Sequence, residues 1–146
     1  MTGFQRGSSL IPIQTAFVTA LSNDTTLSTL INGVYDKRPG PEVALPYITI
    51  GAPQESPWDC FGTLGQIVKF QVSVWWRIAD AKSSLGVKTI MAAVNNVLDD
   101  QVLDVEGYDS SIKIRNMMST DMPDPDNKHW HGIMQFTIWV TQCPES

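Results

Sequence analysis

Apolar residues recur at helical spacing in two parts of the chain. In the first part they are Leu10, Ile13, Phe17, Val18 and Leu21. Ser8 or Ser9 can cap this helix, and Pro12 falls in its first turn, where proline is tolerated. In the second part the apolar face is Val87, Ile90, Met91, Val94, Val97 and Leu98, and Asp80 can cap the start. The pattern therefore predicts two amphipathic helices.

A shorter helical turn is expected between the first helix and the first strand. Asn23 or Asp24 can cap it, Leu27, Leu30 and Ile31 lie on one face, and Gly33 ends it. The segment Val34–Asp36 then leads into a proline-rich loop.

Strands are predicted in four segments, from runs rich in β-branched and aromatic residues or from alternating apolar and polar residues. These are Pro46–Gly51, Gln66–Arg77, Ser111–Thr120 and His131–Gln142. In the last segment, the face predicted to enter the core is Gly132, Met134, Phe136, Ile138 and Val140. The last two segments flank a Pro/Asp/Asn turn and form a predicted hairpin.

The order of these elements predicts a single α+β domain over residues 1–146. We expect a twisted, mainly antiparallel sheet with two helices packed on one face. A length of 146 residues suits one domain. The segment Ala52–Gly65 is rich in Pro, Gly and Ser and is predicted to be a loop. Its Trp58 and Phe61 either fold back onto the core or contact a partner.

The composition and charge argue against several classes of protein. The net charge of -5 disfavours direct binding to nucleic acid, which depends on clustered Lys and Arg. No apolar run approaches the roughly 20 residues that span a bilayer, and the N-terminus does not resemble a secretion signal. We therefore expect a protein made in the cytoplasm, with no membrane partner and with Cys60 and Cys143 as free thiols.

The segment Asp124–Gly132 allows two interpretations. His129 and His131, with one or two of Asp121, Asp124 and Asp126, could bind a divalent metal. Alternatively, the Asp and Asn side chains build a tight turn through local hydrogen bonds. Since no other ligand cluster supports a metal site, we favour the turn and predict no metal or cofactor.

Other catalytic patterns do not occur in the sequence. It has no Gly-x-Ser-x-Gly elbow, no phosphate-binding Gly-rich loop and no His-Glu-x-x-His. Cys60 follows Asp59, and an acidic neighbour raises a thiol pKa. Asp99 and Asp100 lie at the C-terminal end of the second helix, where the helix dipole disfavours negative charge. They are either an acidic cap exposed to solvent or a pair with a function. We predict that the protein is not an enzyme and has no catalytic residue.

Large side chains on the outward strand faces suggest a subunit interface. Ile67, Trp75, Trp130 and Trp139 lie on or beside those faces, unless helices cover them or the sheet is buried on both sides. The interface candidates are Trp58, Phe61, Trp75, Asp124, Asp126, Trp130 and Trp139. If the outward sheet face and the aromatic loop both bind other subunits, each subunit offers two different surfaces, as the subunits of a ring do.

The order of several segments resembles a known family. They are the first helix with Asn23–Leu27, then Val34–Asp36, Pro46–Ile50, Val72–Trp76, the helix to Val97–Leu98, and Asp124–Gly132. Over nearly its full length the chain is similar to tail-terminator, or tail-completion, proteins of long-tailed bacteriophages, prophages and gene-transfer particles. It departs from the usual pattern in Cys60 and the aromatics of the first loop, and in Asn127 where Gly is frequent.

The resemblance implies a structural virion protein of the tail and neck, assembled in the host cytoplasm. Such a protein forms a hexameric ring on the finished tail tube, ends tube polymerisation and presents the head-to-tail joining surface. Its partners would be other copies of itself, the tail tube protein and the head–tail connector. Two alternatives stay open: a head-completion (neck) adaptor or minor tail protein, and a small metallohydrolase that uses His129 and His131.

Overall fold

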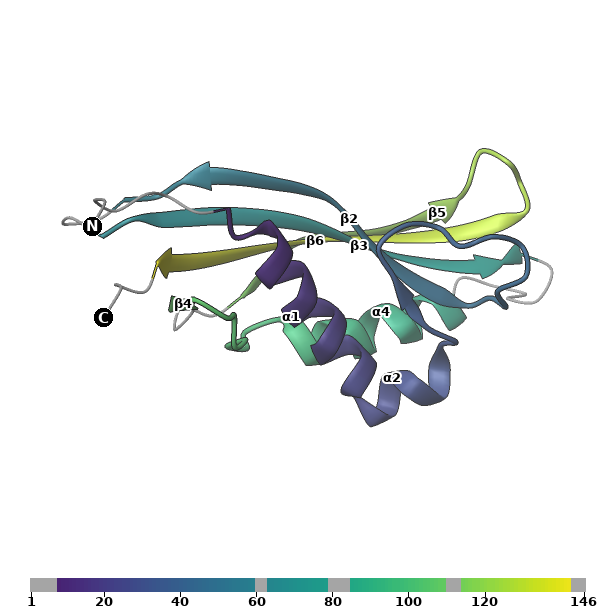
Figure 1. Ribbon diagram of the computed structural model, residues 1–146. Coiled ribbons are helices and arrows are strands. Elements are labelled where there is room, and N and C mark those ends of the chain that lie inside the picture. Colours follow the sequence, from purple (N-terminus) through teal and green to yellow (C-terminus); the bar gives the residue numbers. More distant parts are fainter. Residues whose placement is uncertain (1–7, 60–62, 79–84, 110–113, 143–146) are drawn as a thin grey trace.

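A strongly twisted sheet runs the length of the molecule (Figure 1). The computed structural model describes residues 8–59, 63–78, 85–109 and 114–142. Within them the sheet has six strands: β1 (Val34–Tyr35), β2 (Tyr47–Pro57), β3 (Gly65–Arg77), β4 (Tyr108–Asp109), β5 (Arg115–Pro123) and β6 (His129–Gln142). The order is β1-β2-β3-β6-β4, with β5 also paired to β6. Only the β1–β2 pair is parallel, so the expected antiparallel character is confirmed.

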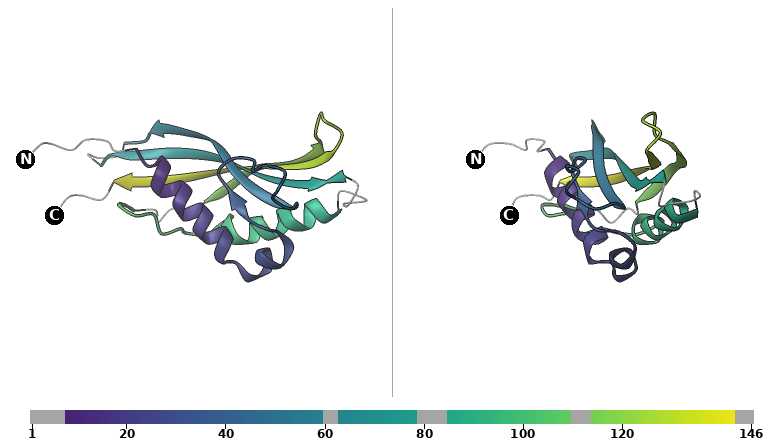
Figure 2. Two further views of the ribbon diagram at one scale, coloured as in Figure 1. Left: turned by 45° about the vertical axis from the view of Figure 1, so that its right-hand side comes forward. Right: turned by 90° about the vertical axis from the view of Figure 1, so that its right-hand side faces the viewer.

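Helices cover one face of this sheet, which confirms the predicted α+β fold (Figures 1 and 2). They are α1 (Leu10–Asn23), α2 (Thr25–Leu30) and α4 (Leu85–Leu98). The helix α1 packs against β1 and β2, whereas α4 packs against β3, β5 and β6. We call the sheet surface that points away from the helices the outward face. None of the described helices combines the length and the apolar character needed to cross a membrane.

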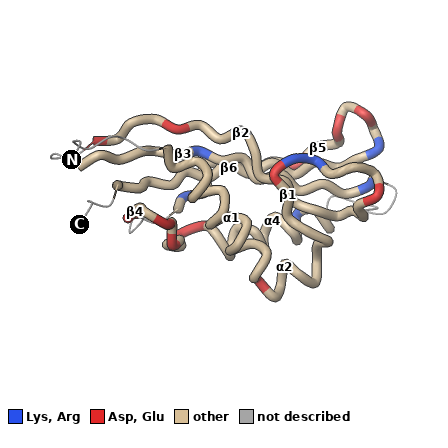
Figure 3. The backbone as a smooth tube through the Cα atoms, in the orientation of Figure 1, with Lys and Arg blue, Asp and Glu red and all other residues tan. Residues whose placement is uncertain are grey.

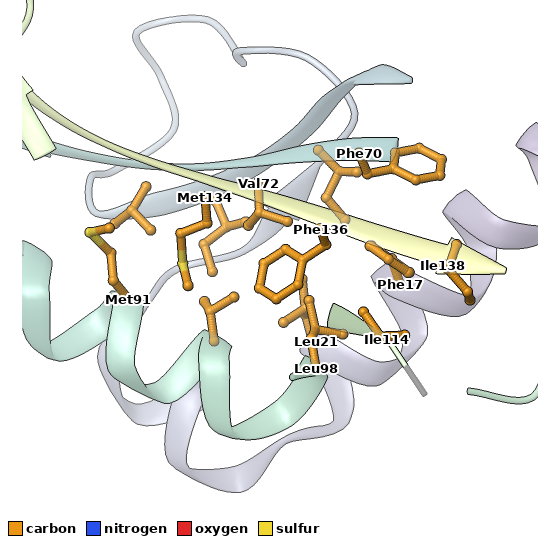
Figure 4. Close-up of a cluster of buried hydrophobic side chains, with 14 of the residues drawn as sticks. Phe17, Leu21, Phe70, Val72, Met91, Leu98, Ile114, Met134, Phe136 and Ile138 are labelled. Carbon is orange, nitrogen blue, oxygen red and sulfur yellow. The ribbon is translucent and has the colours of Figure 1, made fainter. Parts of the chain in front are cut away.

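The core lies between the helices and the sheet (Figure 4). Phe17 of α1 and Phe70 of β3 are fully buried, with ring centroids 5.1 Å apart. The predicted core face of β6 is buried from Gly132 to Val140, as the two-residue period of a strand requires. Burial of that face fixes the register of β6, because a slip by one residue would expose all of it.

The start of each N-terminal helix is fixed by a carboxylate. The Asp24 side chain accepts a hydrogen bond from the Leu27 amide at 2.9 Å, which confirms its predicted capping role. Ser9 precedes α1 but makes no side-chain cap. Instead, its amide and hydroxyl both donate to Oε2 of Glu55, at 2.6 and 2.5 Å. Glu55 therefore fastens the first turn of α1 to β2.

The prediction of a loop over Ala52–Gly65 is wrong for its first half, because β2 continues to Pro57. A bulge between Gly51 and Gln54 accommodates Pro53, a residue that would otherwise interrupt the strand. Only Ile48 and Thr49 of β2 pair with β1, so Pro53 and Pro57 lie on an edge where no ladder donor is needed. The Trp58 amide donates to the Gly65 carbonyl at 2.8 Å and closes the strand end.

Some predicted positions lie outside the described residues. These are Cys60, Phe61, Asp80, Ser111 and Cys143.

Candidate assembly surface

The turn between β5 and β6 is built by its own carboxylates. The Asp124 amide donates to the His129 carbonyl at 2.8 Å, and Asn127 adopts a positive φ of 57°. Oδ1 of Asp126 accepts hydrogen bonds from the amides of Lys128 and His129, at 2.8 and 3.2 Å. The predicted structural turn is therefore present, and Asn127 adopts the positive φ that its place in the turn requires.

The Asp126 side chain also contacts the first histidine. Its Oδ2 lies 2.6 Å from Nδ1 of His129. The hydrogen bond from the Lys128 amide, followed by those from His129, lowers the pKa of Asp126 from 3.8 to about 2. The hydrogen bonds of the Asp126 carboxylate described above are thus made to residues of the turn itself.

The second histidine faces a different neighbour. His131 stacks on Trp75 of β3, with ring centroids 3.7 Å apart and an interplanar angle of 14°. Its Nε2 atom is buried without a hydrogen-bond partner among the described residues, and burial lowers its pKa from 6.5. In the part of the chain that the structure describes, no three His, Cys, Asp or Glu side chains gather as metal ligands would.

Trp75 lies on the outward face but is covered within the subunit. Its Nε1 donates to Oγ1 of Thr49 at 3.0 Å, and Cζ of Arg38 lies 4.0 Å from its ring centroid. With His131 also on the ring, Trp75 keeps only 8% of its surface exposed. Little of the indole is left for a partner, so among the interface candidates its main role is packing.

Trp130 and Trp139 lie on opposite faces of β6. Trp130 packs against the core on the helix side, and its Nε1 donates to Oδ2 of Asp121 at 2.9 Å. The same oxygen accepts from Nζ of Lys88 in α4, at 3.2 Å. Trp139 lies on the outward face opposite Ile67, and both are partly exposed. Trp58, also partly exposed, sits at the far end of β2. Of the candidates, Trp58, Trp130 and Trp139 thus keep part of their surface available, as do the turn carboxylates.

The most exposed apolar side chains on the sheet are methionines of β5. A register shift between Asn116 and Met118 inserts Met117 as an extra residue. Met117 is 64% exposed, Met118 41% and Met122 42%. A hydrogen bond of 2.8 Å from the Asn116 amide to Oδ1 of Asp99 holds the bulge against the end of α4. Asp99 therefore binds β5 to the end of α4, and its side chain is not simply an acidic cap exposed to solvent.

Two cations flank this bulge on the outward face. Thr137 of β6 pairs with Lys69 of β3 on one side and with Arg115 of β5 on the other. We define the cationic methionine patch as Lys69, Arg115, Met117 and Met118. Sequence reasoning missed it, although two adjacent methionines on a predicted strand cannot both enter the core and so signal an exposed one.

Comparisons with known proteins agree with this fold. The chain matches the family model described as tail completion protein gp17 over residues 15–141. No curated protein matches it. Among solved structures, a chain from the virion of a native gene transfer agent particle superposes with a TM-score of 0.80 at 20% identity, covering 93% of this chain and 99% of that one. A second solved chain has a TM-score of 0.57 at 17% identity, covering 96% and 100%.

The two structural matches show a shared fold, and the family match covers most of the sequence. The resemblance to phage tail-completion proteins is thereby confirmed. The chain belongs to the tail completion protein gp17 family and is a structural protein of phage-like tails.

Proposed function

We propose that this protein is a tail terminator. It forms a hexameric ring on the finished tail tube, stops tube polymerisation and presents the surface that joins the neck of the filled head. The observation that carries the proposal is the match to the tail completion family over residues 15–141. The shared fold with a chain of a gene transfer agent virion supports it.

The mechanism is one of shape and surface and involves no bond chemistry. A ring needs two different patches on each subunit, related by a rotation that closes. The partners would be further copies of this chain, the tail tube protein and the head–tail connector, in the virion tail and neck after assembly in the host cytoplasm. The candidates for contacts with tube or neck are the projecting turn with Asp124 and Asp126 and the partly exposed Trp58, Trp130 and Trp139. Phe61, which lies outside the described residues, stays a candidate, and Trp75 would support the outward face from within the subunit.

Electron microscopy of particles that lack this protein tests the proposal. We expect overlong tails without heads, restored to normal length and joining by the wild-type gene supplied in trans. Normal joined virions would refute any role at the junction. Tails of normal length that merely lack heads would refute termination and favour the neck adaptor.

The remaining enzymatic alternative has its own test. A metallohydrolase would purify with a stoichiometric metal ion that is lost in the variant His129→Ala/His131→Ala. We expect elemental analysis of the purified wild-type protein to give no zinc, manganese or iron at that stoichiometry.

A further inference from the structure

The helix α1 carries no charged residue, although one side of it faces away from the sheet. Solvent-facing sides of helices in globular proteins usually carry charged residues. In α1 that side presents Thr15, Thr19 and Ile11, of which Ile11 is 81% exposed. Figure 3 shows both N-terminal helices without charge except near Asp24. Loss of charge around an exposed aliphatic residue is typical of the centre of a protein–protein interface.

A groove of about 430 Å³ runs along this side of α1. Pro12, Ala16 and other small or apolar residues of the helix form one wall. The opposite wall is the loop that follows α4, with Leu103 and the two carboxylates Asp104 and Glu106. We call this the acidic groove. It combines an apolar floor with negative charge along one wall.

The cationic methionine patch has the complementary character. Met117 and Lys69 both line a hollow of about 200 Å³ on the outward face. Within the described residues, neither Lys69 nor Arg115 forms an ion pair, and the same is true of Asp104 and Glu106. Methionine side chains are flexible and adapt to irregular apolar surfaces. The charges of the two surfaces are opposite and are not used inside the subunit.

The two surfaces also lie in different layers of the molecule. The groove belongs to the helical layer, whereas the patch belongs to the outward face of the sheet (Figures 1 and 2). A contact between two different surfaces is heterologous, so it leaves one of each kind free on a pair of subunits. Such a contact continues from subunit to subunit until a rotation closes the ring.

We propose that the cationic methionine patch of one subunit docks into the acidic groove of the next copy of this chain. Lys69 and Arg115 then face Asp104 and Glu106, while Met117 and Met118 cover the uncharged surface of α1. The proposal rests on the ring of the proposed function and names the surfaces that build it.

Charge reversal tests the pairing directly. The variant Asp104→Lys/Glu106→Lys makes the groove basic, and Lys69→Glu/Arg115→Glu makes the patch acidic. Each alone brings like charges together. We expect the protein concentration at half-assembly to rise about tenfold or more, or the fraction of tails that carry a ring to fall by a similar factor. Combining all four substitutions restores the opposite charges and should recover assembly to near the wild-type level.

Matched controls separate this effect from a general change in charge. Asp36→Lys/Glu42→Lys changes the net charge as much as the reversal of the groove does, and Lys37→Glu changes it as much as either single substitution in the patch; all three positions are exposed and lie outside both surfaces. We expect both to assemble like the wild type. Circular dichroism and melting curves confirm that each variant is folded before assembly is measured by sedimentation and by microscopy of tails.

A cysteine pair gives a second readout that does not depend on charge. In a background of Cys60→Ser/Cys143→Ser, the variant Thr15→Cys/Met118→Cys is expected to form a ladder of cross-linked species larger than a dimer under mild oxidation. The two single-cysteine variants are the controls and should not extend beyond a dimer.

The outcomes separate the two proposals. If the wild type forms rings and the reversed variants assemble equally well, this pairing is wrong while the ring stands. If one reversal impairs function but the four-fold variant shows no recovery and no ladder forms, the surfaces bind another partner such as the tube protein, and the pairing is again wrong. If the wild type stays monomeric both in solution and on tails, the ring itself is refuted.

Discussion

Gly132 of β6 lets α4 approach the sheet, and its replacement by alanine tests how tightly the two layers are packed. A Cβ atom at this position would lie 2.7 Å from Sδ of Met91 and 2.9 Å from Cγ1 of Val87. Overfilling a packed core costs roughly 1–3 kcal/mol. The entropic advantage of alanine over glycine in a strand offsets about 0.5–1 kcal/mol of that. From the midpoints of these two ranges, we expect Gly132→Ala to lower the free energy of unfolding by roughly 1 kcal/mol, a fall in melting temperature of about 2–4 °C.

Urea denaturation and calorimetry measure this change, and the chain offers a matched control. Gly51 of β2 also lies in a strand, but a Cβ atom there would meet nothing within 4 Å. Gly51→Ala should therefore leave the stability unchanged or raise it slightly. In the Gly132→Ala background, Val87→Ala removes one clashing methyl group, so the two changes should cost less together than the sum of their separate effects. Equal stability of the two glycine variants, or strict additivity with Val87→Ala, would refute the packing argument.

Four further predictions concern the covered tryptophan, the histidine stacked on it, the turn and the helix cap. Trp75→Phe leaves the buried Thr49 hydroxyl without its donor, so we expect a loss of roughly 1–3 kcal/mol in urea unfolding, much of it absent when Thr49 is already Val. The folded-state pKa of His131 lies below 6.5, so the unfolded chain takes up the proton first. Stability should fall as the pH drops below 6.5 and level off below the folded pKa, and His131→Gln should abolish that step in a pH series of urea curves. For Asp126 the pKa falls from 3.8 to about 2 on folding, so its contribution is present above pH 3.8 and is lost as the pH falls through about 2, which Asp126→Asn should remove from an acid titration. Asp24→Ala removes the cap of α2 and should cost about 1 kcal/mol by thermal unfolding, whereas an unchanged melting temperature would show that packing of Leu27 alone holds the helix.

The parts of the fold that could be predicted are those in which one local pattern decides the structure. The alternation in β3 and β6 and the helical repeat of α4 each place a continuous apolar face against the core, and the structure buries those faces. The turn before His129 was equally predictable because Asp124 and Asp126 bond to amides within a few residues. In these segments, local preference and burial agree.

The rest depended on contacts between distant residues. The Ser9–Glu55 hydrogen bonds join positions 46 apart in sequence, and no local pattern signals them. The same holds for Trp75, whose outward position was predicted correctly but whose cover by Arg38 comes from a long loop that folds back. The length of β2 was missed because Pro53 breaks a strand in most settings but is tolerated at an edge bulge.

The uninterrupted pairing of β3 with β6 has a mechanical consequence. Every residue of β3, from Gly65 opposite Thr141 to Arg77 opposite His129, has a partner on β6. Hydrogen bonds between antiparallel strands run perpendicular to the strands. A force along the long axis of the sheet that pulls β3 and β6 in opposite directions would therefore load the whole ladder in shear. Its hydrogen bonds would then have to break together and not one by one. A sheet of this form resists stretching along its long axis far better than peeling from its edge.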